Sequence, residues 1–137
     1  MKPRISVLTL TVSNLEKSVA FYQDGLGFAT EGIIGREFEH GAVAFFQLDH
    51  GLRLALWPRQ SLAADSGLVD GPPSHLEHLL GHNVASPVEV DQVMAQVAKA
   101  GGKIIKPAQS TFWGGYAGYF QDPDGHAWEI VFNPAFN

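Results

Sequence analysis

The fold is decided by two stretches of sequence, Ser13-Asn14-Leu15-Glu16-Lys17-Ser18-Val19-Ala20-Phe21-Tyr22 and Ser86-Pro87-Val88-Glu89-Val90-Asp91-Gln92-Val93-Met94. In both, a serine precedes a glutamate by three residues, which is the capping-box pattern of a helix start. Apolar residues follow at helical spacing, and glycines after residues 24 and 100 predict the helix ends. The two boxes begin at Ser13 and Ser86, which gives an offset of 73 residues, while the helix-ending glycines indicate an offset nearer 75; both numbers are odd.

Segments of alternating polarity flank both predicted helices, and they are typical of strands. They form the same order in each half of the chain: 4–12, 28–34, 41–48 and 52–57 in the first, and 75–85, 103–106, 115–121 and 126–132 in the second. Asp122-Pro123-Asp124-Gly125 is a strong turn signal between the last two. Each half is therefore predicted to be strand–helix–strand–strand–strand, an internal repeat.

The repeat predicts an α+β fold with two βαβββ modules that form a curved mixed-sheet cup, with the helices on its outer face. We expect one domain of residues 1–137, with modules at 4–57 and 75–133 and a linker with a short helix at 58–74. The face against the helices should be apolar: Leu8, Leu10, Val12, Leu54, Leu56, Trp128, Ile130 and Phe132. The other face should line a cavity with mixed residues: Thr9, Thr11, Gln47, Arg53, Trp57, His82 and Glu129.

Composition narrows the class of protein. The 137 residues are 45% hydrophobic and 17% charged, which is typical of a globular domain. The net charge of −5 and the lack of a basic run argue against nucleic acid as a partner. No apolar run approaches the roughly 20 residues of a membrane-spanning helix. With no apolar signal segment and no cysteine, a cytoplasmic location is expected.

The sequence resembles the vicinal oxygen chelate superfamily, which includes glyoxalase I, extradiol dioxygenases and bleomycin-resistance proteins. The resemblance rests on the order and spacing of several pieces: residues 12–22 with Leu26-Gly27-Phe28, then Gly81-His82-Asn83-Val84, Gly101-Gly102, and residues 122–129. It implies paired βαβββ modules, frequent homodimers, and a small molecule bound in the cup. In the enzymes of the family it also implies one divalent metal (Zn, Ni, Mn or Fe) that chelates vicinal oxygens of the substrate.

The resemblance places metal ligands on the first and last strands of each module. In the second module these positions hold His82 and Glu129. In the first module they hold residues that are neither imidazole nor carboxylate: Val7 or Thr9 on the first strand, and Ala55, Arg53 or Trp57 on the last. Because a catalytic metal site usually has three or more protein ligands, the sequence predicts an incomplete metal site.

His82 and Glu129 are nevertheless the predicted catalytic residues. Three interpretations stay open for them: a residual metal site, a metal-free pair that binds a polar ligand or exchanges protons, and a structural hydrogen-bonded pair.

The predicted substrate-binding residues are Thr9, Arg53, Trp57, Trp113, Tyr116 and Tyr119. The last three come from a glycine-rich aromatic stretch, 112–119, which is typical of a pocket lip but also of a hairpin packed on the core or of a dimer contact. Arg53 is expected either to clamp a ligand carboxylate or to be solvated. Trp57 is expected either to line the cup or to pack under residues 58–65.

Two functions from different classes follow. The first is a bleomycin-resistance-like protein that binds a small molecule without a complete catalytic metal site. The alternative is a metal-dependent lyase, isomerase or dioxygenase of the glyoxalase I type, so enzymatic activity stays open. A plain dimeric interaction module is a third interpretation, but it needs no polar groups inside the cup.

Overall fold

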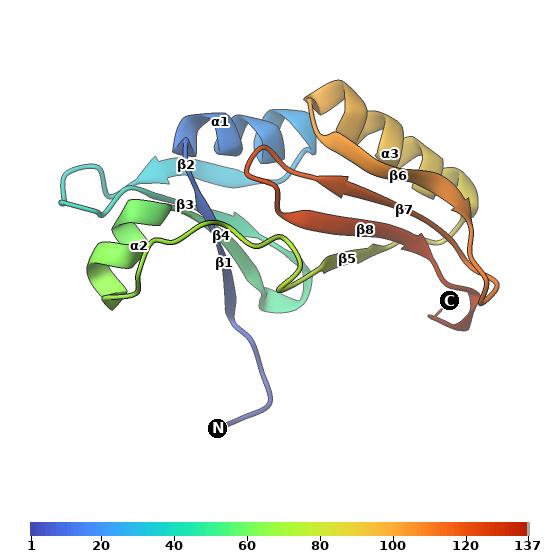
Figure 1. The fold of residues 1–137 in the computed structure, drawn as a ribbon, viewed down its shortest axis with the longest axis horizontal. Coiled ribbons are helices and arrows are strands. Elements are labelled where there is room, and N and C mark those ends of the chain that lie inside the picture. Colours follow the sequence, from blue (N-terminus) through green and yellow to red (C-terminus); the bar gives the residue numbers. More distant parts are fainter. Residues whose placement is uncertain (137) are drawn as a thin grey trace. The chain divides into compact units, whose positions relative to one another are not determined.

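The computed structural model describes residues 1–136, and the chain divides into two compact units, Met1–Pro72 and Pro73–Asn137. Each unit contains one βαβββ module, and the elements follow the chain as labelled in Figure 1. We call them the first and the second module. The α+β fold class and the repeated order of elements predicted from the sequence are confirmed.

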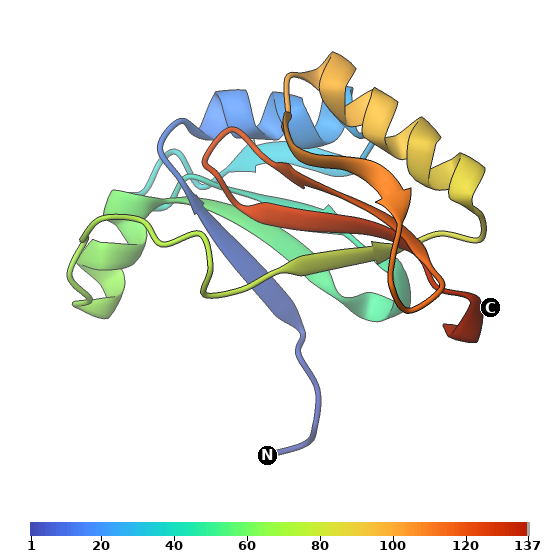
Figure 2. The same ribbon diagram turned by 45° about the vertical axis from the view of Figure 1, so that its right-hand side comes forward.

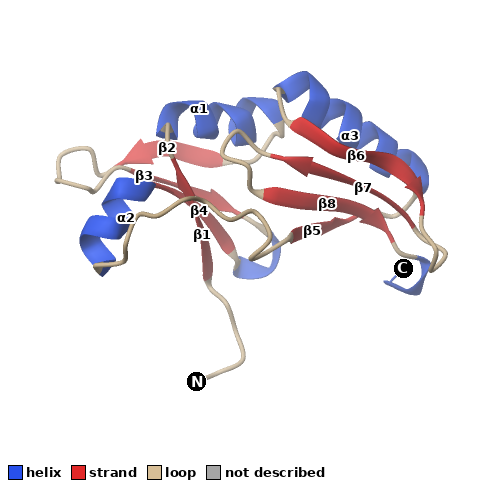
Figure 3. Cartoon of the chain, viewed as in Figure 1, coloured by secondary structure: helices blue, strands red, loops and turns tan. Residues whose placement is uncertain are grey.

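The first module is a four-stranded mixed sheet in the order β1-β4-β3-β2. β1 runs parallel to β4, and the other neighbours are antiparallel. A π-helical turn, Phe21–Gly25, prolongs α1. The bounds are β1 Val7–Val12, α1 Leu15–Ala20, β2 Thr30–Ile34, β3 Val43–Gln47, β4 Arg53–Pro58 and α2 Arg59–Ser66. α2 lies in the segment where a short helix was expected (Figure 3).

The second module has the same strand order, β5-β8-β7-β6, again with one parallel pair, β5 with β8. Its bounds are β5 Leu80–Asn83, α3 Pro87–Ala100, β6 Lys103–Ser110, β7 Tyr116–Gln121 and β8 Ala127–Phe132. The strand predicted over 75–85 was too long, because β5 begins only at Leu80. Before it, the ring of His75 packs against Gly125 in the turn between β7 and β8.

The hydrogen bonds at the starts of α1 and α3 show which residues cap the two helices, and they correct the predicted offset between the caps. The Ser86 side chain accepts from the Glu89 backbone N–H (3.2 Å), as in a capping box, but the Glu89 carboxylate accepts from the Ala85 N–H (3.2 Å), one residue before the cap. In the first module the cap is Asn14, whose Oδ1 accepts from the Lys17 N–H (2.9 Å), and not Ser13. The offset from Asn14 to Ser86 is therefore 72 residues, an even number.

One face of each sheet is covered by the helix of its own module, α1 or α3, as Figure 2 shows. The predicted apolar residues lie on these faces. Leu10, Val12, Leu54, Leu56, Trp128 and Ile130 are buried, and Trp128 stacks on Phe120 with ring centroids 5.9 Å apart. Burial of these side chains supplies the main stabilising free energy of each module. Among residues 1–136, no helix is both long and apolar enough to cross a membrane.

Candidate functional site

Glu129 lies in the middle of β8, in a row of side chains that crosses the second sheet. Its neighbours in the row are Gly81 on β5 and Tyr119 on β7, and Tyr119 in turn pairs with Lys106 on β6. Successive strand residues alternate between the two faces of a sheet. Because Ile130 packs on the α3 side, this row points to the face that α3 leaves open.

Tyr119 and Glu129 form a direct hydrogen bond. The phenol of Tyr119 donates to Oε1 of Glu129 over 2.8 Å. This bond raises the pKa of Tyr119 above its ordinary value, and partial burial and the negative charge of Glu129 raise it further. Within residues 1–136 it is the one hydrogen bond made by the Glu129 side chain, so the second carboxylate oxygen can accept a hydrogen bond from a ligand.

These two residues line a cavity of about 270 Å³, which we call the Glu129 pocket. Its walls combine a carboxylate, an ammonium group, hydroxyl and amide groups, and aromatic rings: Lys106, Gln109, Ser110, Thr111, Phe112, Trp113, Ala117, Tyr119 and Glu129. Polar groups and aromatic rings on one cavity wall can fix the orientation of a small ligand.

Trp113 lines this pocket and is held by its own loop. The Thr111 N–H donates to the Gly115 carbonyl, and the Gly115 N–H donates to the Thr111 hydroxyl; both bonds are 2.9 Å. The indole ring lies against Gly115, where any Cβ atom would collide with it. Glycine therefore lets the ring fold back onto the loop, and Trp113 remains 42% exposed for contact with a ligand.

Tyr116 is not part of the pocket, which corrects one predicted binding residue. It pairs with Phe132 on the opposite face of the sheet from Tyr119. Its phenol donates to the Asp91 carboxylate on α3 over 2.9 Å, and this bond raises the pKa of Tyr116, with smaller contributions from burial and from the charge of Asp91. Tyr116 therefore fastens α3 to the sheet.

His82 does not lie beside Glu129, as the predicted catalytic pair required. On β5 it pairs with Ile130, whereas Glu129 pairs with Gly81. Since the side chains of adjacent strand residues point to opposite faces, His82 and Glu129 lie on opposite faces of the sheet. A difference of one residue along β5 is enough to place a side chain on the other face of the sheet.

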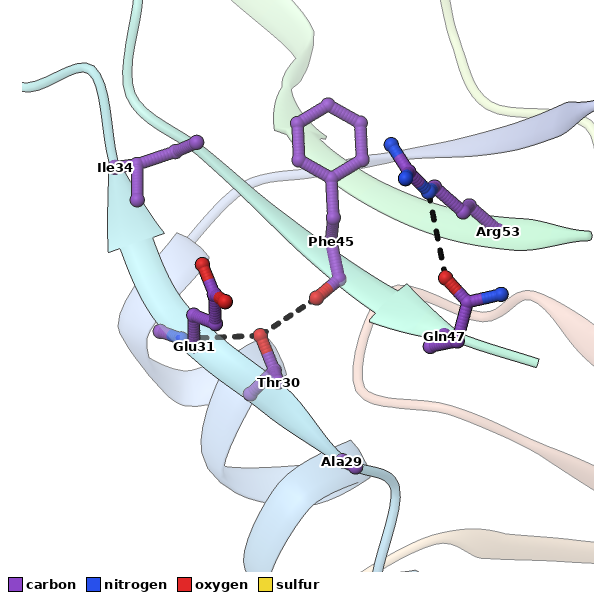
Figure 4. A pocket seen from close by; sticks show the side chains of 8 residues that line it. Ala29, Thr30, Glu31, Ile34, Phe45, Gln47 and Arg53 are labelled. Carbon is purple, nitrogen blue, oxygen red and sulfur yellow. Dashed lines mark hydrogen bonds between the residues drawn. The ribbon is translucent and has the colours of Figure 1, made fainter. Parts of the chain in front are cut away.

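The three predicted residues of the first module lie on the open face of its sheet. Thr9 pairs with Ala55 and is exposed. The indole N–H of Trp57 donates to the His40 carbonyl (3.0 Å), which fastens Trp57 to the loop between β2 and β3. Arg53 lines a second cavity of about 510 Å³, the Arg53 pocket, shown in Figure 4 with Ala29, Thr30, Glu31, Gly32, Ile34, Phe45 and Gln47.

Sequence reasoning missed two charged residues of these pockets, Lys106 and Glu31. Both lie on strands with irregular register. β6 shifts between Ile104 and Lys106, and β2 shifts between Thr30 and Ile33. An irregularity of this kind breaks the alternation of faces, so simple alternation gave no signal for either side chain.

Comparison with known proteins identifies the family. Residues 4–130 match the model of the Glyoxalase/Bleomycin resistance protein/Dioxygenase superfamily. The chain belongs to this superfamily. A glyoxalase-related enzyme from Fulvimarina pelagi is 38% identical over 96% of this chain and 89% of its own, with a TM-score of 0.81.

Other solved members of the superfamily are more distant. A glyoxalase/bleomycin resistance protein/dioxygenase from Nocardioides is 28% identical, with a TM-score of 0.77, over 96% of this chain and 84% of its own. A lactoylglutathione lyase from Agrobacterium tumefaciens is 19% identical, with a TM-score of 0.69, over 100% of this chain and 98% of its own. At that identity, the likeness shows the fold alone.

The superfamily implies a divalent metal, and the donor groups of this chain do not fit one. His82 lies on the opposite face of the sheet from Glu129, and one oxygen of Glu129 already accepts a hydrogen bond from the Tyr119 phenol. Across residues 1–136, no three His, Asp or Glu side chains gather where they could hold a metal ion. Three protein ligands are the usual minimum for a catalytic metal.

Proposed function

We propose that this superfamily member binds a small hydroxyl-bearing organic molecule in the Glu129 pocket without a catalytic metal. The observation that carries the proposal is the Tyr119–Glu129 hydrogen bond of 2.8 Å inside that pocket. Tyr119 holds one carboxylate oxygen, and the other is left to accept a hydroxyl of the ligand. A charged acceptor makes a stronger hydrogen bond than a neutral one.

The remaining walls suit a small flat ligand. Trp113 supplies an aromatic surface at the lip, and Lys106 and Thr111 supply polar groups on the same cavity. The volume of about 270 Å³ lies just below the usual range for ligand sites, so only a small ligand fits. An aromatic diol meets these conditions, because its hydroxyls donate to Glu129 while its ring packs on Trp113.

The test is a thermal-shift and calorimetric titration with catechol, compared with its dimethyl ether, which has no hydroxyl to donate. Catechol should raise the melting temperature, since a ligand that binds only the folded state stabilises it. Glu129→Gln should weaken binding at least about tenfold, the ratio that a lost charge-assisted hydrogen bond brings.

Two tyrosine variants provide a matched pair of controls. Tyr119→Phe removes the phenol that positions Glu129, and we expect a loss of about threefold or more from the missing hydrogen bond. Tyr116→Phe removes an equivalent tyrosine–carboxylate bond on the other face, and it should leave the affinity unchanged. Equal binding of the dimethyl ether, or equal effects of the two variants, would remove the support for this proposal.

A metal-dependent lyase, isomerase or dioxygenase is the second candidate. It is favoured by the 38% identity to the Fulvimarina protein, which is described as a glyoxalase-related enzyme. Metal analysis of protein purified without a histidine tag separates the two candidates. One divalent ion per chain that is lost on His82→Ala and Glu129→Gln would establish the metal site and overturn metal-free binding.

We also propose that the chain forms a homodimer, as its resemblance to the superfamily implies. Support comes from large apolar side chains that stay exposed, among them Ile105 and Phe112. Sedimentation velocity over a range of concentrations tests this, and a monomer at every concentration would contradict it.

A further inference from the structure

We propose that the Arg53 pocket of the first module is a second binding site, which takes the carboxylate of a small organic acid with one negative charge and an apolar body. The proposal does not depend on the function of the Glu129 pocket, because the two cavities share no residue. It rests on four features of the first sheet: an oriented arginine, exposed apolar side chains, a glycine bulge and a single opposing charge.

The guanidinium of Arg53 is oriented before any ligand arrives. The side-chain amide of Gln47 donates to its neighbouring carbonyl, Leu48 O, over 3.3 Å, which turns Oε1 of Gln47 toward β4. That oxygen accepts from Nε of Arg53 over 3.4 Å (Figure 4). The terminal nitrogens of Arg53 make no ion pair within residues 1–136, so their N–H groups can form the planar fork that binds a carboxylate.

Apolar side chains lie next to the guanidinium of Arg53. Phe45 pairs with Ala55, and Gln47 pairs with Arg53, so Phe45 and Arg53 are diagonal neighbours on one face. Diagonal neighbours are about 7–8 Å apart, within reach of an aromatic ring and a long side chain. Phe45 is 37% exposed and Ile34 is 49% exposed, although both belong to the pocket wall. A ligand bound through its carboxylate to Arg53 would cover them.

The hollow itself comes from a bulge in β2. The register of β2 shifts between Thr30 and Ile33, and Gly32 has φ = +91°. The Thr30 hydroxyl donates to the Phe45 carbonyl over 2.7 Å and accepts from the Gly32 N–H over 3.1 Å, which fixes the bulge. Gly32 has no side chain and no atom lies within 4 Å of where its Cβ would be, so the sheet is open at this point.

Glu31 sets the charge that the pocket accepts. It follows Thr30 on β2, two strands away from Arg53, and its carboxylate lines the same cavity. Two strand spacings amount to about 10 Å, so a carboxylate on Arg53 can avoid Glu31, but a second negative charge on the ligand would approach it. Because like charges repel across a partly solvated cavity, the site should prefer one negative charge to two.

The test is an amide NMR titration of the full chain with 3-phenylpropionate, with neutral 3-phenylpropanamide as the matched probe. The acid should shift the amide signals of Gly32 and Phe45, and the neutral amide should bind at least about tenfold more weakly. Arg53→Gln should weaken binding of the acid by a similar factor. Arg36→Gln removes an exposed arginine of the same module that pairs with Glu16, and it should change nothing.

Two further comparisons separate this site from the Glu129 pocket and test the role of Glu31. Lys106→Gln, which removes a cation of the Glu129 pocket, should leave 3-phenylpropionate binding intact; a loss there, with none in Arg53→Gln, would move the acid to the Glu129 pocket and overturn this inference alone. Phenylsuccinate, with two negative charges, should bind more weakly than 3-phenylpropionate. Its affinity should rise about threefold or more in Glu31→Gln, because that variant removes the opposing charge. No binding of 3-phenylpropionate, or tighter binding of phenylsuccinate, would also overturn it.

Discussion

The two modules have the same strand order, yet the open faces of their sheets carry different chemistry. In the first module the central row of side chains is Thr9, Ala55 and Phe45. The corresponding row of the second module is Gly81, Glu129 and Tyr119. Glutamate replaces alanine, and tyrosine replaces phenylalanine, so only the second module gains the hydrogen-bonded pair that defines its pocket.

The faces that pack on the helices differ much less. Phe46 pairs with Leu54 in the first module, and Phe120 pairs with Trp128 in the second. Phe46 and Phe120 are 0% and 1% exposed. The repeat therefore preserves the hydrophobic packing that stabilises each sheet, while the open faces carry different side chains.

The largest expected effect concerns the preserved face. Phe46→Ala and Phe120→Ala should each lower the free energy of unfolding by about 3–5 kcal/mol, because each leaves a cavity in a packed core. Urea denaturation followed by circular dichroism measures both. Should either substitution cost less than about 1 kcal/mol, the two helix-facing sides would not be equivalent.

A second, smaller effect should distinguish the two hairpin turns. Gly51 and Gly125 have φ of +80° and +87°, so alanine at either position costs about 1–2 kcal/mol of strain. At Gly51 no atom lies within 4 Å of an added Cβ, but at Gly125 the His75 ring occupies that place.

Gly125→Ala should therefore destabilise the protein more than Gly51→Ala in the same denaturation experiment. In the double variant His75→Ala/Gly125→Ala, the extra loss of stability should disappear, because the imidazole ring that collides with the new Cβ is gone. A cost at Gly51 equal to that at Gly125 would show that the close approach of His75 does not matter to stability.

The smallest expected effect is a change in the pKa of a tyrosine in one of the two tyrosine–carboxylate pairs. The pKa values of Tyr116 and Tyr119 are both raised above 10.0, first of all by their hydrogen bonds to Asp91 and Glu129. A raised pKa in the folded state gives stability that is complete below the ordinary pKa of the unfolded chain. This stability is lost as the pH rises through the folded pKa.

Glu129→Gln should therefore lower the pKa of Tyr119 toward its ordinary value and leave that of Tyr116 unchanged. Phenolate absorbance against pH, with Tyr116→Phe and Tyr119→Phe used to assign the two titrations, gives both values. A shift in the Tyr116 titration instead would contradict the separation of the two tyrosines by the sheet.

Much of the fold could be predicted because its signals are local. A capping residue, an apolar stripe and glycines at the end define α3 without reference to the rest of the chain. The turn at Asp122 is equally local, since its side chain accepts from the backbone N–H groups of Asp124 and His126. For the candidate site, three of the residues singled out in the sequence, Glu129, Tyr119 and Trp113, line one cavity, and their roles stay predictions.

The errors at the site came from register. Ser13 and Asn14 are both good helix caps, and only the folded chain shows that Asn14 makes the bond. That single residue decides whether the offset between the two helix caps is odd or even, but the pairing of β5 with β8 decides on which face His82 lies. Tyr116 and Tyr119 are three residues apart in one strand, so they necessarily point to opposite faces.

The sequence by itself therefore determined the α+β class, the repeated order of elements and the apolar faces of the sheets, because these follow from short-range periodicity and capping. The tertiary structure alone decided which polar side chains meet. The Tyr119–Glu129 pair, the separation of His82 from Glu129, and the orientation of Arg53 by Gln47 all depend on pairing between strands. Strand pairing and its bulges are long-range features, and a displacement of one residue reverses the face that each side chain occupies.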